Sequence, residues 1–228
     1  GIEAETPFLV WERLPLNLAS RLRGPMPAPA VRKLLHDLAD FVVELDGLRV
    51  TSPLRTTWDL GRQRYVEPSL AAMDQMLRLG RFSAAELVAG VPRFKGMRWV
   101  TTLRLMVGYV DGRAESPPES ILRLRWLQAH LPRPVPQLEV YDVEGTFLAR
   151  LDLGNEEIAF AAEYDGAEWH SSPDQLRHDR DRRALVENET PFRVVAVRKE
   201  NLFGPRADVE AVLRRGVAEA RRGRGLVA

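Results

Sequence analysis

The acidic side chains best placed for chemistry come directly after short apolar runs in the second half of the chain. Leu148–Leu151 is followed by Asp152, and Ile158–Ala162 is followed by Glu163 and Asp165. Apolar runs of this length, bounded by turn residues, are typical of buried strands. A carboxylate at the end of such a strand needs a cation, a hydrogen-bond donor or a metal ion to offset its desolvation. The pattern therefore indicates a site built from acidic oxygens.

Turn residues connect these runs into hairpins. Gly145 precedes the first run, and Gly154–Asn155 separates the two runs. A hairpin brings Asp152, near the end of one strand, close to the start of the next strand. The pattern alone therefore leaves open whether the acids converge.

A further acid, Glu119, allows two interpretations. Ser116 can cap a helix with Pro117 at its first position and Glu119 at its third, which is the spacing of a capping box. Alternatively, Glu119 presents its carboxylate toward the strand ends. The sequence does not decide between these two roles.

The composition describes a globular chain and excludes several classes of protein. The 228 residues are 45% hydrophobic and 29% charged, with no run of transmembrane length and no signal-peptide pattern. The absence of Cys excludes disulfides and thiolate zinc sites, so we expect a cytoplasmic protein without membrane contact. A net charge of +1 argues against a surface coated for nonspecific nucleic-acid binding and leaves room for a local basic patch. The oligomeric state is not encoded in any of these features.

The periodicity predicts a helical first half and an α-β-β-β-α-β-α order from residue 116 onward. The expected elements of the first half are a hairpin at Asp46-Gly47 and helices 54–62, 68–79, one from Ser83, and 95–109. The expected elements of the second half are a helix from Ser116, strands 137–141, 146–152 and 158–165, helix 172–188, strand 192–197 and helix 207–222. We therefore expect an α/β (α+β) protein with an N-terminal region and helical connector over 1–110 and a second domain over 111–228.

Aromatic and basic residues allow more specific expectations. Trp99 and Trp126 are expected in the core, whereas Trp169 stands beside His170. Arg183 can form an ion pair with Asp179, one helical turn away. The other histidines lack the spacing of zinc ligands.

Several short motifs follow one another in order along the second half of the chain. They are Glu119-Ser120, Leu151-Asp152-Leu153, Glu163-Tyr164-Asp165-Gly166, His170, Gln175, Asp179, Arg183 and Leu185. This set resembles the endonuclease-like domain of unknown function related to the very-short-patch repair (Vsr) endonucleases, within the PD-(D/E)XK (restriction endonuclease-like) superfamily. That superfamily has an α-β-β-β-α-β core. Gly47–Thr56 with Asp59-Leu60 is similar to the connector in actinobacterial proteins of this type, where a winged-helix segment similar to the AbiEi-type antitoxin often comes first.

The resemblance implies a DNA endonuclease that hydrolyses phosphodiester bonds with Mg²⁺ or Mn²⁺. The site residues that it implies are Glu119, Asp152, Glu163, Asp165 and His170. The implied metal ligands are Asp152, Glu163 and the carbonyl oxygen of Tyr164. His170 is the implied general acid or base, because its ordinary pKa suits proton transfer near neutrality. Under the same resemblance Trp169 is the aromatic residue expected near DNA, and Arg183 is expected on a phosphate unless it pairs with Asp179.

The sequence departs from the superfamily pattern at three places. Asp165 stands where the superfamily has a lysine that positions water, and Glu189–Phe192 replaces the Gly-Trp expected before the last strand. Residues 1–35 show too little regular helix for a winged helix. Three hypotheses therefore remain: a metal-dependent endonuclease, a DNA-binding regulator or antitoxin-like protein with a catalytically silent nuclease fold, and an interaction domain whose acids only cap helices and form ion pairs.

Overall fold

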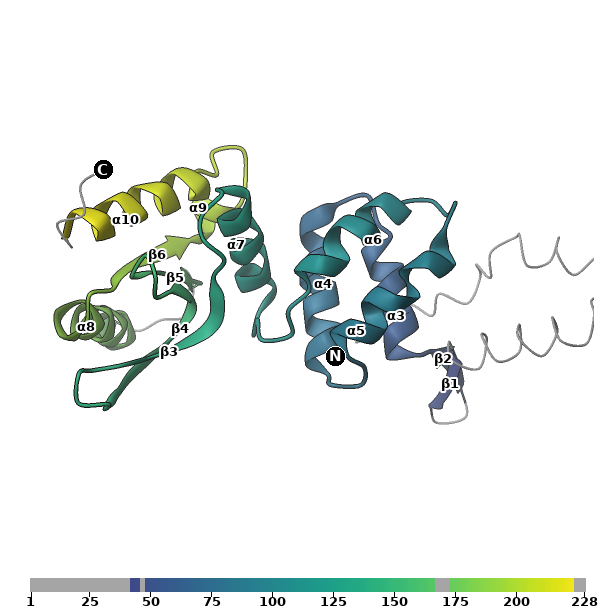
Figure 1. Cartoon of the computed structure of the whole chain (residues 1–228), viewed down its shortest axis with the longest axis horizontal. Coiled ribbons are helices and arrows are strands. Elements are labelled where there is room, and N and C mark those ends of the chain that lie inside the picture. The colour runs from purple at the N-terminus through teal and green to yellow at the C-terminus, as the bar shows by residue number, and fades with distance from the viewer. Residues whose placement is uncertain (1–41, 46–47, 167–172, 224–228) are drawn as a thin grey trace, which may run out of the picture.

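The computed structural model describes residues 42–45, 48–166 and 173–223. Within these ranges the chain forms a helical half and a sheet half that lie side by side (Figure 1). No helix in the described ranges is both long enough and apolar enough to cross a membrane.

The helical half opens with the predicted hairpin, in which β1 (Val42–Leu45) pairs antiparallel with β2 (Leu48–Thr51). The elements that follow are α3 (Pro53–Gly61), α4 (Val66–Arg78), α5 (Ala84–Gly90), the 3₁₀ segment η1 (Val91–Phe94), α6 (Val100–Met106) and the 3₁₀ segment η2 (Val107–Tyr109). Ser52 and Ser83 cap α3 and α5, and Glu86 completes the predicted capping box. The helices close around the buried indole of Trp58, whose N–H donates to the Leu87 carbonyl oxygen at 2.8 Å.

The predicted helix 95–109 is wrong over its first five residues. Helix α6 begins only at Val100, because Gly96 (φ 80°) and Trp99 (φ 61°) adopt left-handed conformations that a helix cannot contain. The expectation that Trp99 belongs to the core is also wrong, since its side chain is 37% exposed. The expectation for Trp126 is confirmed, because that residue is fully buried.

The sheet half follows the predicted order. Its elements are α7 (Pro117–Gln128), β3 (Val135–Tyr141), β4 (Phe147–Asn155), β5 (Phe160–Asp165), α8 (Pro173–Glu189), β6 (Arg193–Arg198), the short α9 (Lys199–Leu202) and α10 (Val209–Gly223). The four strands form one sheet in the order β3-β4-β5-β6. Strands β3, β4 and β5 are antiparallel neighbours, whereas β5 and β6 run parallel and are joined through α8. The mixed α/β fold and its helical first half are therefore confirmed.

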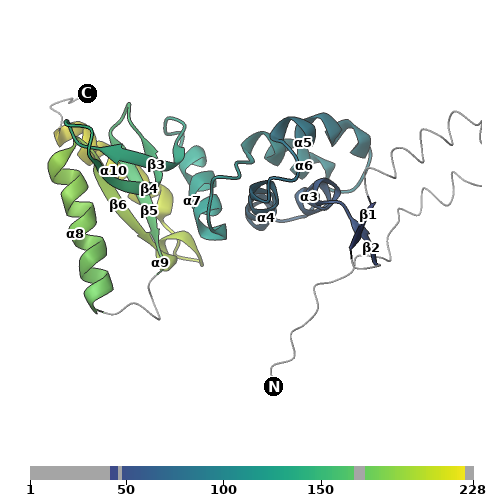
Figure 2. The ribbon, with the colours of Figure 1, turned by 90° about the horizontal axis from the view of Figure 1, so that it is seen from below.

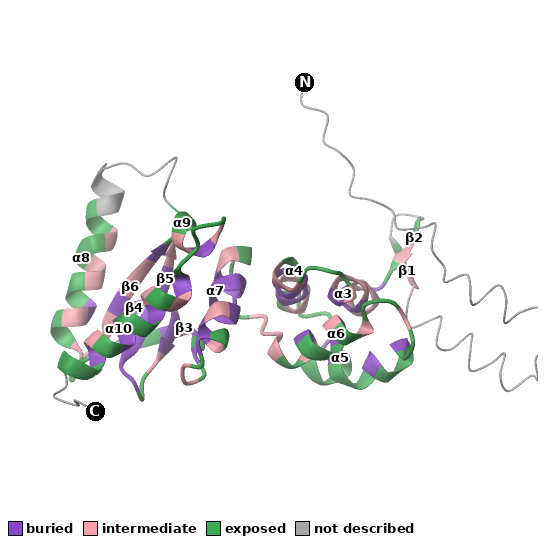
Figure 3. Cartoon of the chain, turned by 90° about the horizontal axis from the view of Figure 1, so that it is seen from above, coloured by how far each residue is buried: buried purple, intermediate pink, exposed green. Residues whose placement is uncertain are grey.

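Helices cover both faces of the sheet (Figure 2). On one face, α7 and α10 pack against Leu153, Phe160 and Ala162, and the ring of Trp126 stacks on Phe160 at 5.1 Å. Gly216 lets α10 come close, because a Cβ at that position would lie 2.4 Å from the Phe160 ring. On the other face, α8 packs against the sheet through Val186. Figure 3 shows buried residues concentrated on the strands and on the helix faces toward them.

Helix α7 contributes to the cores of both halves. Leu124 packs with the core of the helical half, whereas Leu122 and Trp126 pack with the core of the sheet half. The two cores therefore share one helix.

A buried ion pair fixes α7 against α4. Arg123 Nη2 donates to Asp74 Oδ2 at 2.7 Å, and the two side chains are 3% and 0% exposed. The Asp111 N–H donates to the other Asp74 oxygen at 2.8 Å, and Arg123 donates to the Tyr109 carbonyl oxygen at 2.5 Å. The connection between the halves is thus held by charge-assisted hydrogen bonds inside the protein.

Candidate functional site

The acids converge where β4 and β5 separate. Antiparallel pairing of the two strands runs from Asn155 opposite Phe160 to Leu153 opposite Ala162. Asp152 lies one residue beyond this pair on β4 and Tyr164 two residues beyond it on β5, and the Tyr164 N–H donates at 2.8 Å to Oδ2 of the Asp152 side chain. The Asp152 carboxylate thus accepts the Tyr164 N–H in place of a backbone carbonyl oxygen of β4, at the point where β4 and β5 are no longer paired. The sequence could not settle this convergence, because it depends on where the pairing ends.

The Asp152 carboxyl is destabilised in its charged form. Burial raises its pKa from 3.8 to about 7, against the lowering effect of the Tyr164 N–H bond. The neighbouring Glu119 and Glu163 carboxylates contribute to this rise in pKa, and the Arg182 guanidinium opposes it. Both of these acids therefore lie within electrostatic reach of Asp152.

Glu163 directly precedes Tyr164 in β5, and its side chain points toward α8. Its carboxylate is 4% exposed and accepts two hydrogen bonds from the Arg182 guanidinium, at 2.8 and 3.2 Å. Arg183 lies 3.6 Å from the same carboxylate and 4.0 Å from Asp165 Oδ2. Two adjacent arginines of α8 thus supply the positive charge that these strand acids require.

Arg183 does not form the ion pair that the sequence suggested. Asp179 lies 3.9 Å from Arg182, whereas Arg183 reaches back to the β5 acids. The helix phase explains the difference, because α8 turns residue 183 toward the sheet.

Glu119 lies in the capped first turn of α7, but it does not complete the predicted capping box, because its carboxylate accepts the Glu115 N–H and not the Ser116 N–H. The Ser116 side chain accepts the Glu119 N–H, and the Glu119 carboxylate accepts the Glu115 N–H at 2.8 Å and the Ser116 hydroxyl at 2.7 Å. Gln137 Nε2 from β3 donates to the same carboxylate at 2.8 Å. The carboxylate also raises the pKa of Asp152, so it faces the candidate site while it caps α7.

Two of the residues expected in the site, Trp169 and His170, lie outside the described residues. Arg182 is the site residue that the sequence analysis missed. A buried strand acid calls for a cation, and the dense charge of 177–183 offered several. Which arginine pairs with Glu163 depends on the rotational orientation of α8 relative to the sheet, and no sequence pattern gives that orientation.

The oxygen donors suit a divalent cation of the magnesium type. Within the described ranges, no group of three acidic or histidine side chains is close enough to hold a metal ion. Mg²⁺, however, is usually bound by one or two carboxylates, with water and substrate phosphate completing its shell. Asp152 and Glu163 supply two carboxylates within electrostatic reach of each other, and added positive charge beside them would stabilise the charged form of Asp152.

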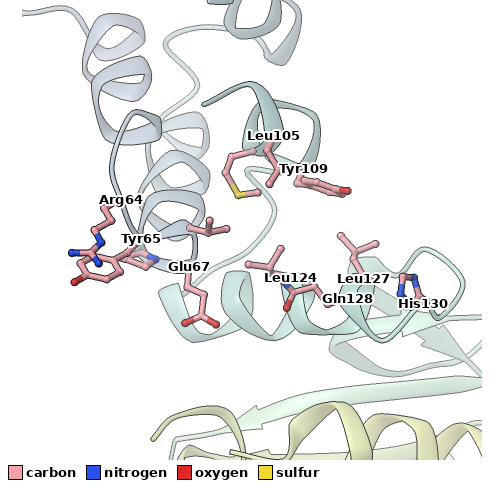
Figure 4. Close-up of a pocket in the computed structure, with 12 residues that line it drawn as sticks. Arg64, Tyr65, Glu67, Leu105, Tyr109, Leu124, Leu127, Gln128 and His130 are labelled. Carbon is pink, nitrogen blue, oxygen red and sulfur yellow. The ribbon is translucent and has the colours of Figure 1, made fainter. Parts of the chain in front are cut away.

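A cavity of about 710 Å³ lies elsewhere, between α4, α6 with η2, and α7 (Figure 4). Its lining includes Tyr65, Leu105, Tyr109, Leu127 and His130, and none of the strand acids. The acids rather than this cavity define the candidate site, because the lining holds a single carboxylate, Glu67, and that carboxylate is already paired with Arg125.

We predict that Asp152→Asn stabilises the metal-free protein at neutral and alkaline pH. The folded-state pKa of about 7 lies above the ordinary value of 3.8, so the folded protein binds the extra proton between these values. The free energy of unfolding therefore falls as pH rises through that window. Partial exposure limits the effect to about 2 kcal/mol above neutrality, and it vanishes near pH 4. Urea unfolding of both proteins in EDTA across this range measures it; a pH-independent difference would contradict the assignment.

Comparison with known proteins gives a distant relationship. No family model matches the chain, and no solved structure matches it. It is 30% identical over 165 residues to the uncharacterized proteins Rv2248 and MT2308 of two Mycobacterium tuberculosis strains, over 72% of this chain. The matched region spans 60% of the length of these relatives. What the comparisons show is therefore a distant similarity to mycobacterial proteins.

Proposed function

We propose that the sheet half is a metal-dependent DNA endonuclease domain of the PD-(D/E)XK type, similar to the Vsr-like domains. The observation that carries the proposal is the meeting of Asp152 and Glu163 where β4 and β5 separate. This meeting occurs on an α-β-β-β-α-β frame, in which the first helix presents Glu119 beside Asp152. Fold similarity alone does not establish an activity, so the proposal rests on the acids.

In this proposal Asp152, Glu163 and the Tyr164 carbonyl oxygen hold Mg²⁺ or Mn²⁺. A bound divalent cation supplies charge neutralisation at the phosphate and a more acidic water. The Tyr164 N–H holds the Asp152 carboxylate in place for this role. With Glu163 holding a cation, Arg182 and Arg183 would be available to donate to phosphate oxygens, for which a planar guanidinium is well suited. His170 remains the proposed general acid or base.

A second candidate is a DNA-binding regulator that retains a silent nuclease fold. The observation in its favour is that Arg182 and Arg183 already neutralise Glu163 and Asp165 within the chain. Asp165 also occupies the position at which the superfamily has a lysine. An acid site neutralised by its own arginines can be structural rather than catalytic.

A plasmid-nicking assay separates the two candidates. Supercoiled plasmid is incubated with the protein in Mg²⁺, Mn²⁺ or EDTA, and binding to the same DNA is measured in parallel. Nicking that requires the divalent cation supports the endonuclease. Binding without nicking under any metal supports the regulator, and the absence of both overturns both candidates.

We predict that Arg182→Gln strengthens Mn²⁺ binding about tenfold while it weakens nicking. Arg182 competes with a cation for the Glu163 carboxylate at 2.8 Å, so its removal leaves a buried acid without its main partner. The variant is therefore less stable in EDTA, and Mn²⁺ restores its melting temperature. Calorimetric titration with Mn²⁺ measures the affinity.

The matched control for this prediction is Arg180→Gln, which removes the same charge from an exposed position of α8. Equal Mn²⁺ affinity of the two variants would contradict the competition between Arg182 and the cation.

A further inference from the structure

Basic residues gather in one segment of the helical half. Between Glu86 and Asp111 the sequence has no acidic residue and four basic ones, which are Arg93, Lys95, Arg98 and Arg104. Three of these, Arg93, Lys95 and Arg98, are exposed in η1 and in the turn before α6. We call residues 93–99 the basic turn.

The basic turn is fixed on α3 by stacked side chains. Phe94 is buried, and the guanidinium groups of Arg55 and Arg62 lie 5.5 and 4.9 Å from the centre of its ring. Arg62 Nη1 also donates to Met97 Sδ at 3.3 Å. The turn therefore presents its cations from a defined position.

Trp99 adds an exposed aromatic ring to this surface. Its left-handed φ of 61° places the residue outside α6, and its side chain is 37% exposed. The Arg98 guanidinium lies 5.1 Å from the centre of the indole ring. An exposed indole beside cations is the arrangement on which nucleic-acid bases stack.

The acids near the basic turn do not cancel its charge. Asp59 lies between Arg55 and Arg62, at 2.7 Å from each. Glu86 lines a cavity with Arg93, and its carboxylate accepts the Ser83 N–H and hydroxyl at 2.8 Å. Five basic residues (55, 62, 93, 95 and 98) less these two acids give +3 for this surface, against +1 for the whole chain. This surface therefore keeps a positive balance after its own ion pairs are counted.

We propose that the basic turn and Trp99 form a second DNA contact surface, outside the candidate nuclease site. Arg93, Lys95 and Arg98 contact backbone phosphates, and Trp99 stacks on a base or sugar. The views in Figures 1 and 2 both place α3, on which the turn is packed, farther from the sheet than α4. DNA held at both surfaces therefore extends along the protein. This inference rests on the proposed function, because it takes DNA as the ligand.

The test compares two charge-matched triple variants of the full chain. One carries Arg93→Gln, Lys95→Gln and Arg98→Gln; the control carries Arg215→Gln, Arg221→Gln and Arg222→Gln, at exposed positions of α10. Fluorescence anisotropy with a labelled duplex is recorded over a range of salt concentrations. We expect the basic-turn variant to bind about 10–100-fold more weakly, with a salt slope lower by about 2–3, and the control to bind nearly as the wild type does.

The single variant Trp99→Ala tests the stacking contact. Its affinity for a labelled single strand is expected to fall about tenfold, whereas the salt slope stays unchanged because no charge is lost. Circular dichroism and thermal melting confirm that each variant is folded.

The outcomes separate this inference from the proposed function. If the wild type binds DNA and the basic-turn variant binds equally well, or no worse than the control, the second surface is wrong and the proposed function stands. If the wild type does not bind DNA, both are wrong. Weaker binding by the basic-turn variant, with its Mn²⁺ affinity unchanged, supports a contact surface independent of the metal site.

Discussion

Asp152→Asn and Glu163→Gln are each expected to lower the proposed metal-dependent nicking by about 10³-fold, which corresponds to about 4 kcal/mol of transition-state stabilisation. Each substitution removes one of the two carboxylates that meet between β4 and β5, while it preserves the side-chain shape. An amide is a poor ligand for a hard divalent cation, so both variants also lose Mn²⁺ binding in calorimetric titration.

The design separates lost chemistry from lost structure. Asp152→Asn is expected to be more stable than the wild type at neutral pH, so its inactivity cannot come from unfolding. Glu139→Gln provides the matched control, because Glu139 is an exposed acid on β3 that bonds only to the Tyr141 hydroxyl among described residues. Nicking that survives in Asp152→Asn or Glu163→Gln, with intact Mn²⁺ binding, would place the metal site elsewhere.

Arg123→Leu is expected to destabilise the protein by about 3–5 kcal/mol, because it leaves the fully buried Asp74 without its cation. Burial already raises the pKa of Asp74, against the lowering effects of Arg123 and of the Asp111 N–H. Removing Arg123 raises this pKa further. The loss of stability is therefore largest near neutrality and becomes smaller as falling pH protonates Asp74.

Urea unfolding at neutral and mildly acidic pH measures this effect. The double variant Asp74→Asn with Arg123→Met recovers most of the loss, because it removes both charges and keeps an acceptor for the Asp111 N–H. A double variant as unstable as Arg123→Leu would show that the loss came from packing rather than from an uncompensated charge.

Local patterns were sufficient to predict most of the elements. The apolar runs of β4 and β5, the capping residues Ser83 and Ser116, and the order of the elements along the sheet half follow from short stretches of sequence. The exception was the segment before Val100, where two left-handed residues overrode a helical pattern.

The candidate site was only partly predictable, because its geometry depends on contacts between distant residues. Asp152 and Glu163 could be named from their positions after apolar runs, but their convergence depends on where β4 and β5 stop pairing. Arg182 could not be distinguished from Arg183 without the phase of α8. The Asp74–Arg123 pair joins residues 49 positions apart, a separation that no periodicity reveals.

The sharing of α7 by both cores has a consequence for how the protein can be divided. A fragment ending at residue 110 would lack Leu124 and Arg123, and would expose the apolar surface around Trp58 together with an unpaired Asp74. A fragment beginning at residue 111 would expose the other side of the same helix. A break in the chain between residues 111 and 116 is therefore expected to leave the two pieces associated. We therefore expect excised fragments to be poor substitutes for the intact chain. Glu119 lies in the first turn of the shared helix α7, so its position depends on the packing of both halves.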